Sequence, residues 1–230
     1  MTTAMRRLFF MLSLLAASSA SAFSLSDLSD RDVVTGLKDA LNQSTANAIL
    51  RLGKENGFLS YDKVKIPLPP TLKKAEKLMR TFGMKKQADE LVLGMNRAAE
   101  KAVPEAKALF VDAVKQMSFD DARKILTGGD DAATQYFRKV TEQPLTTKFL
   151  PIVTDVTSKI GLAKQYNQFA GTASKLGVMK EKDAKIEDYV TRQALDGFYV
   201  VMAEEEKAVR ANPVKAGTDL LKKVLGAIRK

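Results

Sequence analysis

The side chains with the widest scope for chemistry in this chain are its carboxylates, because the sequence contains no histidine and no cysteine. Their absence excludes the Ser-His-Asp triad, thiol nucleophiles and His-ligated zinc or iron. Neither a P-loop nor a G-x-G-x-x-G loop is present to hold a phosphate group. A catalytic site would have to use acids, Lys, Tyr or Ser. Two carboxylates whose pKa values are pushed apart could then perform acid–base chemistry.

Two groups of polar residues could supply such a site. The first follows a Gly-Gly pair in the middle of the chain, and the second lies on a predicted long helix nearer the C-terminus. If two of these acids lay about 5–9 Å apart in a cleft, the alternative function would be a carboxylate-dependent hydrolase of an envelope polymer. The candidates are Asp130, Asp131, Gln135 and Arg138 in the first group, and Tyr189, Arg192 and Asp196 in the second.

Metal binding is another interpretation of the first group. Gly129-Asp130-Asp131 matches the metal-binding signature of some RNA polymerases, and Gly-Gly-Asp-Asp resembles that of cyclic-dinucleotide synthases. Both place the acids on a β-hairpin, whereas the flanking residues here have a helical period. A calcium loop needs oxygen ligands at alternate positions, which Asp130-Asp131-Ala132-Ala133 lacks. We therefore expect no metal, no cofactor and no catalytic residue.

Helix ends explain the same residues more simply. Ser118 and Asp121 have the spacing of a capping box at a helix N-terminus. Gly128 or Gly129 would end that helix with a positive φ, and Asp130 would cap the helix that follows. The sequence thus predicts a tight corner between two helices.

Apolar residues recur at helical spacing along most of the chain, and Pro and Gly interrupt them often. This pattern predicts an all-α fold, a single irregular domain of about eight helices. Pro144 should open one helix, and Pro151 should kink or divide it. The longest helix should run from about Glu187 to Ala211. Gly197 inside it favours the close approach of another helix, with a ligand contact as the alternative.

One short Pro-rich stretch departs from the helical period. Its apolar residues Val64, Ile66 and Leu68 alternate with Lys65 and Pro67, which indicates an extended segment. Because prolines are excluded from central strands, we expect the segment to lie across helices rather than in a sheet.

The first residues have the three parts of a signal peptide. Arg6-Arg7 is a basic region, Leu8–Ala17 is an apolar run too short to span a bilayer, and Ala20-Ser21-Ala22 is a cleavage site. We expect residues 1–22 to be removed and residues 23–230 to be exported to the periplasm, or secreted, as one domain. Because the chain has no cysteine for lipid attachment, we expect it not to be a lipoprotein.

Positive charge is concentrated between Asp62 and Lys86, where eight basic residues stand against two acidic ones. A basic helical face can lie on an anionic membrane, although an ordinary solvated face over a buried stripe has the same pattern. The stretch lacks interleaved aromatics and any nucleic-acid-binding motif, so we expect no nucleic acid partner. The candidates for a membrane or anion surface are Lys63, Lys65, Lys73, Lys74, Lys77, Arg80, Lys85 and Lys86.

Four motifs follow one another in a recognisable order. They are Lys65-Ile66-Pro67-Leu68-Pro69, Gly128 to Arg138, Phe149-Leu150-Pro151-Ile152-Val153 and Asp188-Tyr189-Val190-Thr191-Arg192. With these motifs, the chain from about Leu28 to Leu225 resembles a family of exported helical proteins of Gram-negative bacteria, catalogued as domain of unknown function 4197. The resemblance implies an all-helical exported domain. It brings no activity, substrate or catalytic residue.

Export, helical amphipathicity, local positive charge and missing catalytic groups together favour a non-enzymatic binding or interaction protein. Its expected partner is an apolar ligand held between helices, an anionic membrane surface or an envelope protein. The sequence leaves these partners open, and the hydrolase stays the alternative.

Overall fold

A computed structural model describes residues 30–73, 81, 83–175 and 185–212. Within these residues the chain forms helices and connecting segments and no β-strand, which confirms the all-α prediction. The predicted signal peptide, residues 1–22, lies outside the described residues. The elements are α1 (Asp30–Leu52), α3 (Lys85–Ala102), the 3-10 turn η2 (Val103–Glu105), α4 (Ala106–Gln116), α5 (Phe119–Thr127), α6 (Ala132–Thr157), α7 (Gly161–Lys175) and α8 (Ile186–Ala211).

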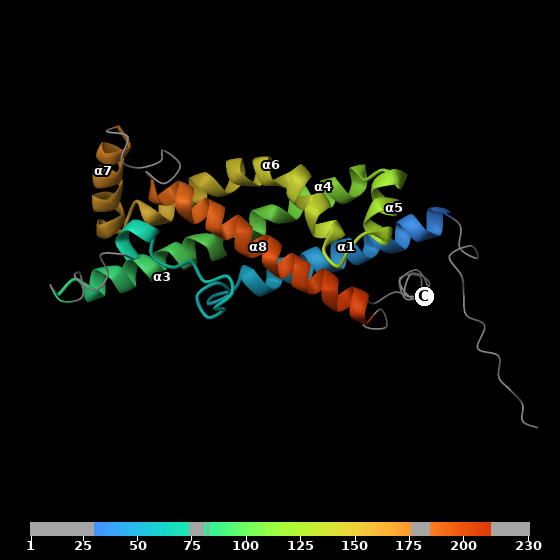
Figure 1. Ribbon diagram of the computed structural model, residues 1–230, viewed down its shortest axis with the longest axis horizontal. Helices are drawn as coiled ribbons and strands as arrows, with labels where there is room; N and C mark the ends of the chain where they lie inside the picture. Colours follow the sequence, from blue (N-terminus) through green and yellow to red (C-terminus); the bar gives the residue numbers. More distant parts are fainter. Residues whose placement is uncertain (1–29, 74–80, 82, 176–184, 213–230) are drawn as a thin grey trace, which may run out of the picture.

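The two longest helices, α6 and α8, form an antiparallel pair along the length of the molecule (Figure 1). Helices α1, α3 and α4 pack against this pair, α7 crosses one end and α5 lies at the other. The centre is aromatic, because the ring of Phe110 lies 5.0 Å from that of Phe137 and 5.2 Å from that of Phe198. Burial of such large apolar rings dominates the stability of a core.

Helix α6 is continuous through Pro144 and Pro151, so the prediction that Pro144 opens a helix is wrong. Each proline removes one backbone donor from the helix. Leu145, Phe149 and Val153 on the same helix are completely buried, and this burial outweighs the lost hydrogen bonds. The spacing of these three residues is that of one continuous helix, and the rule that a proline opens a helix fails here.

Some glycines lie at helix ends with the expected conformation, and others do not. Gly83 has a φ of 76°, as expected where a helix ends. A glycine between apolar residues, as in Ile160-Gly161-Leu162, is typical of a helix C-terminus, but Gly161 begins α7. Gly128 has an extended conformation, with φ −84° and ψ −177°. Among the described glycines, only Gly83 has a positive φ. The predicted positive φ at Gly128 or Gly129 is therefore wrong.

The extended Pro-rich segment lies across the helices as predicted, with Val64, Ile66 and Leu68 buried. The backbone of Ile66 is paired with the Asn96 side chain of α3 instead of with a strand. Its N–H donates to Asn96 Oδ1 and its carbonyl accepts from Nδ2, both at 2.9 Å. Asn96 is completely buried, so this pairing satisfies backbone groups that water does not reach.

Gly197 in α8 lies under the loop that leads into this segment. A Cβ at Gly197 would lie 2.9 Å from Phe58 Cε1 and 3.0 Å from Val64 Cβ. The predicted close approach therefore exists, but the neighbour is a loop and not a helix. A glycine costs about 1 kcal/mol in a helix interior, and here it makes room for the loop.

Candidate functional site

The α5–α6 corner (residues 118–138) contains the first group of candidate residues. Ser118 and Asp121 form the predicted capping box at the start of α5. Asp130 is not a helix cap, because Asp131 occupies the N-cap position of α6 and makes no side-chain cap bond. Asp130 instead forms an exposed ion pair with Lys207 at 3.2 Å, and Asp131 accepts a hydrogen bond from Gln135 at 2.9 Å.

The residue that caps α6 is Glu206, on α8. Its carboxylate accepts hydrogen bonds from the backbone N–H groups of Ala133 and Thr134, each at 2.9 Å. Arg210 donates to the same carboxylate and to the carbonyl of Ile125 at 2.8 Å. One buried acid thus joins α5, α6 and α8. In the sequence, Glu206 and Arg210 have only the spacing of a local i,i+4 pair, and nothing indicates contacts more than 70 residues away.

Arg138 and Asp196, from the two candidate groups, meet between α6 and α8. They form an ion pair at 2.9 Å, and the Arg138 guanidinium lies 4.6 Å from the centre of the Tyr199 ring. Burial raises the pKa of Tyr199 to about 12, and its hydroxyl hydrogen-bonds Thr141 at 2.9 Å. Tyr199, which the sequence did not single out, is thus the centre of this cluster.

The remaining residues of the second group lie at the other end of α8. Tyr189 is buried, and its hydroxyl donates to the carbonyl of Pro67 at 3.1 Å. Burial raises the pKa of Tyr189 to about 12, so the phenol stays protonated and donates at neutral pH. Arg192 is half-buried on the same helix. Tyr189 therefore holds the extended segment on α8.

The candidate acids are bonded to other side chains of the protein and lie away from its clefts. Asp130, Asp131 and Asp196 are each engaged by a side chain of the protein itself. None of them lines the clefts described below. No three acidic side chains in the described part of the chain lie close enough together to hold a metal ion. Asp130 and Asp196 thus connect different elements of the fold, whereas Asp131 is engaged within the first turn of α6.

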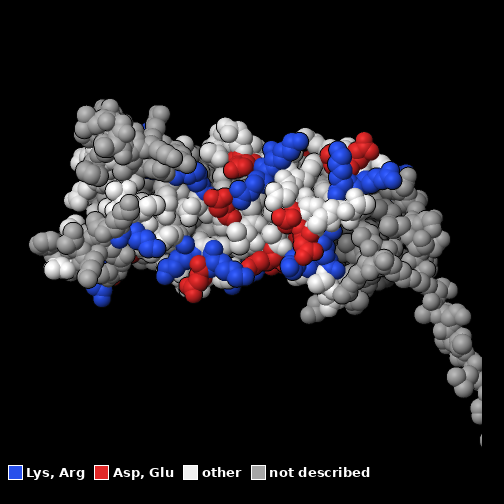
Figure 2. All heavy atoms as spheres, viewed as in Figure 1, with Lys and Arg blue, Asp and Glu red and all other residues white. Residues whose placement is uncertain are grey.

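The predicted basic stretch is divided in the structure. Lys63 donates to Glu204 on α8 at 2.7 Å, and this contact raises the pKa of Lys63. Lys86 lies 3.9 Å from Glu90 on the same helix. Over the face seen in Figure 2, basic and acidic residues of the described chain are interspersed. Lys74, Lys77 and Arg80 lie outside the described residues.

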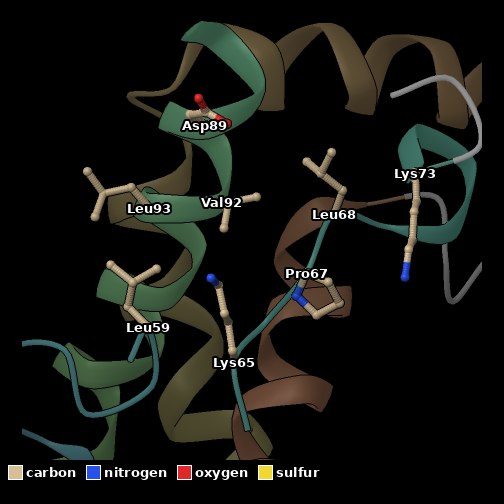
Figure 3. Close-up of a pocket in the computed structure, with 8 residues that line it drawn as sticks. All are labelled: Leu59, Lys65, Pro67, Leu68, Lys73, Asp89, Val92 and Leu93. Atoms are coloured by element: carbon tan, nitrogen blue, oxygen red, sulfur yellow. The ribbon is translucent and has the colours of Figure 1, made fainter. Parts of the chain in front are cut away.

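Two further described lysines of the basic stretch, Lys65 and Lys73, border a cleft between the extended segment and α3. The cleft has a volume of about 380 Å³. Leu93, on its α3 wall, is 43% exposed, a large fraction for a leucine. Figure 3 shows Lys65 reaching between Leu59 and Pro67 toward Val92. The lining residues are Leu59, Lys65, Pro67, Leu68, Lys73, Asp89, Val92 and Leu93.

A second hollow of about 560 Å³ adjoins the first and shares Asp89 and Leu93 with it. It extends along the exposed face of α3 to the start of that helix, where Lys85 and Lys86 line it with Glu90. The candidate site is therefore a groove along α3. Its walls are mainly apolar beside the extended segment, and basic and acidic side chains line it at the start of α3.

Local sequence explains how the first cleft forms. Alternation in the extended segment places Leu68 inward and Lys65 on the exposed edge. Asn96 fixes the position of that segment against α3, one turn beyond Val92 and Leu93. The sequence identified the lysines. The leucine and valine of the wall could have been found only by placing α3 beside the segment.

None of the described helices has the length and the hydropathy needed to cross a membrane. No curated protein sequence and no solved structure shows a significant match to the chain. The model of one family, described as a protein of unknown function (DUF4197), matches residues 27–226. This match covers nearly the whole chain, and the chain therefore belongs to the DUF4197 family.

Proposed function

We propose that the protein is an exported, non-enzymatic binding protein, and that its site is the cleft between the extended segment and α3. The observation that carries the proposal is the wall at Leu93. This leucine is 43% exposed in a concave surface, beside lysines that have no ion-pair partner among the described residues. An apolar wall with a few polar groups at its edge is the usual composition of a ligand site.

Two further observations support binding rather than catalysis. The cleft volume of about 380 Å³ falls within the range of ligand sites. Of the acids that could form a catalytic pair, Asp130 and Asp196 form ion pairs with residues of other helices, and Asp131 accepts a hydrogen bond from Gln135 within the start of α6. The export part of the proposal rests on the signal-like residues 1–22, and N-terminal sequencing of secreted protein should begin at Phe23.

The first experiment is native mass spectrometry of the protein purified from its own source, with lipid extraction of the same sample. A copurified small molecule, lost from a Leu93→Asp variant, is the expected result. Leu50→Asp is the matched control, because Leu50 is 72% exposed on α1 and lines neither cleft.

A fluorescence titration with N-phenylnaphthylamine, an uncharged apolar probe, gives an independent measurement. The chain has no Trp, so the protein contributes little emission of its own. Wild type and Leu50→Asp should bind the probe, and Leu93→Asp should bind it at least about tenfold more weakly, because a carboxylate makes an apolar wall unfavourable for the probe. Equal binding by all three proteins would overturn the assignment of the site.

A further inference from the structure

We infer that the ligand of this cleft is a single-chain amphiphile with an ionised carboxylate, in which Lys65 binds the carboxylate and Leu93 contacts the chain. The inference rests on the proposed function and adds the chemical class of the ligand. It depends on three properties of the lining residues: their charge, their arrangement and the size of the space that they enclose.

Charge gives the first argument. The lining carries two cations, Lys65 and Lys73, and one acid, Asp89. Among the described residues neither lysine has an ion-pair partner, whereas nearby Lys63 is paired with Glu204. Asp89 already takes part in an interaction within the protein. The cleft therefore offers positive charge that an anion from outside can pair with.

Arrangement gives the second argument. Lys65 extends across the mouth of the cleft, with its ammonium group between Leu59 and Pro67 (Figure 3). A carboxylate that reaches this ammonium group forms short charge-assisted hydrogen bonds with it. The apolar residues Val92 and Leu93 continue from that point along α3. A ligand that matches this order has an acidic head joined to an apolar chain.

Size gives the third argument. A volume of about 380 Å³ is near the lower end of the range for ligand sites. Such a space suits one acyl chain better than the two chains of a phospholipid. We therefore commit to a free fatty acid as the occupant, and not to a phospholipid in a bilayer.

The test compares three ligands with the same chain and different heads: dodecanoate, dodecanol and dodecyltrimethylammonium. Each displaces N-phenylnaphthylamine from the full protein below the concentration at which it forms micelles, at about pH 8, where a carboxylic acid is ionised. Wild type should bind dodecanoate about tenfold more tightly than dodecanol, which is the worth of one charge-assisted hydrogen bond. The cationic ligand should bind most weakly.

The variants locate the head group. Lys65→Gln should remove the preference for the acid and leave dodecanol binding unchanged. Lys107→Gln, on the exposed surface of α4, is the charge-matched control and should retain the preference. Because both lysines are exposed, neither substitution should unfold the protein.

The outcomes separate this inference from the proposed function. If dodecanoate and dodecanol bind equally, or if Lys65→Gln retains the preference, the carboxylate-binding role of Lys65 is overturned while the cleft stays a binding site. If neither the probe nor any ligand binds, the proposed function falls as well. If anionic phospholipid vesicles bind the protein and free dodecanoate does not, the surface is a membrane-docking site and the inference is wrong.

Discussion

The α5–α6 corner and the cleft beside α3 use charged residues in opposite ways. At the corner, Glu206 caps two backbone N–H groups and pairs with Arg210, so its charge is used within the fold. At the cleft, Lys65 and Lys73 face solvent beside an exposed leucine. The corner looked more like an active site in the sequence because it concentrates acids. The comparison teaches that a charged side chain is a candidate for ligand binding when it has no ion-pair partner within the fold, whichever residue type it is.

The largest effect should come from removing the buried acid of the corner. Glu206→Ala removes the carboxylate that pairs with Arg210 and accepts from the N–H groups of Ala133 and Thr134. Breaking a buried ion pair in this way costs about 3–5 kcal/mol. Urea unfolding followed by circular dichroism measures the loss. Glu142→Ala, at an exposed position of α6, is the control and should be close to neutral.

The next effect concerns the support of the cleft. Gly197→Ala would push a methyl group into Phe58 and Val64, which hold the loop before the extended segment. Overpacking of this kind costs about 1–3 kcal/mol, more than the gain in helix propensity. Gly129→Ala at the corner is the matched control. It meets only Asp131 Oδ1, at 4.0 Å, so the thermal midpoint should not fall. A stable Gly197→Ala protein would show that the loop moves easily.

A smaller and pH-dependent effect is expected at the start of α5. The Ser118 hydroxyl and the Ser118 backbone N–H both donate hydrogen bonds to the Asp121 carboxylate. These bonds lower the pKa of the Asp121 carboxyl group, and the hydroxyl has the larger effect. Because the pKa is lower in the folded state, this contribution is present above about pH 4 and is lost as the pH falls through the folded pKa. Ser118→Ala should cost about 1 kcal/mol at neutral pH and less in acid.

Titration of the Asp121 carboxyl by NMR gives the direct check. Its pKa should rise toward the ordinary value in Ser118→Ala. An unchanged pKa would mean that the capping box is not formed in solution.

The smallest effect should come from the residue that drew most attention in the sequence. Asp130 and Lys207 are both largely exposed, and such ion pairs contribute about 0–1 kcal/mol. Asp130→Ala should therefore leave the thermal midpoint almost unchanged, in contrast to Glu206→Ala. A loss as large as that of Glu206→Ala would contradict the assignment of the α6 cap.

Local rules predicted the parts of the fold that depend on neighbouring residues. The capping box of Ser118 and Asp121, the extent of α8 and the alternation of the extended segment all follow from residues within a few positions of each other. The cap supplied by Glu206 and the continuity of α6 through Pro144 depend on distant packing, so they could not be predicted. For the candidate site, the sequence supplied Lys65 and Lys73, and the fold supplied their apolar neighbours.

The way in which the extended segment is held has a consequence for self-association. An extended chain normally presents rows of N–H and carbonyl groups on which another chain can pair, and this pairing starts edge-to-edge aggregation. Here Asn96 pairs with both backbone groups of Ile66, Tyr189 binds the carbonyl of Pro67, and Pro67 and Pro69 have no N–H to offer. The one extended stretch among the described residues is therefore unable to recruit a second strand, and concentrated protein should not form β-rich assemblies through this stretch.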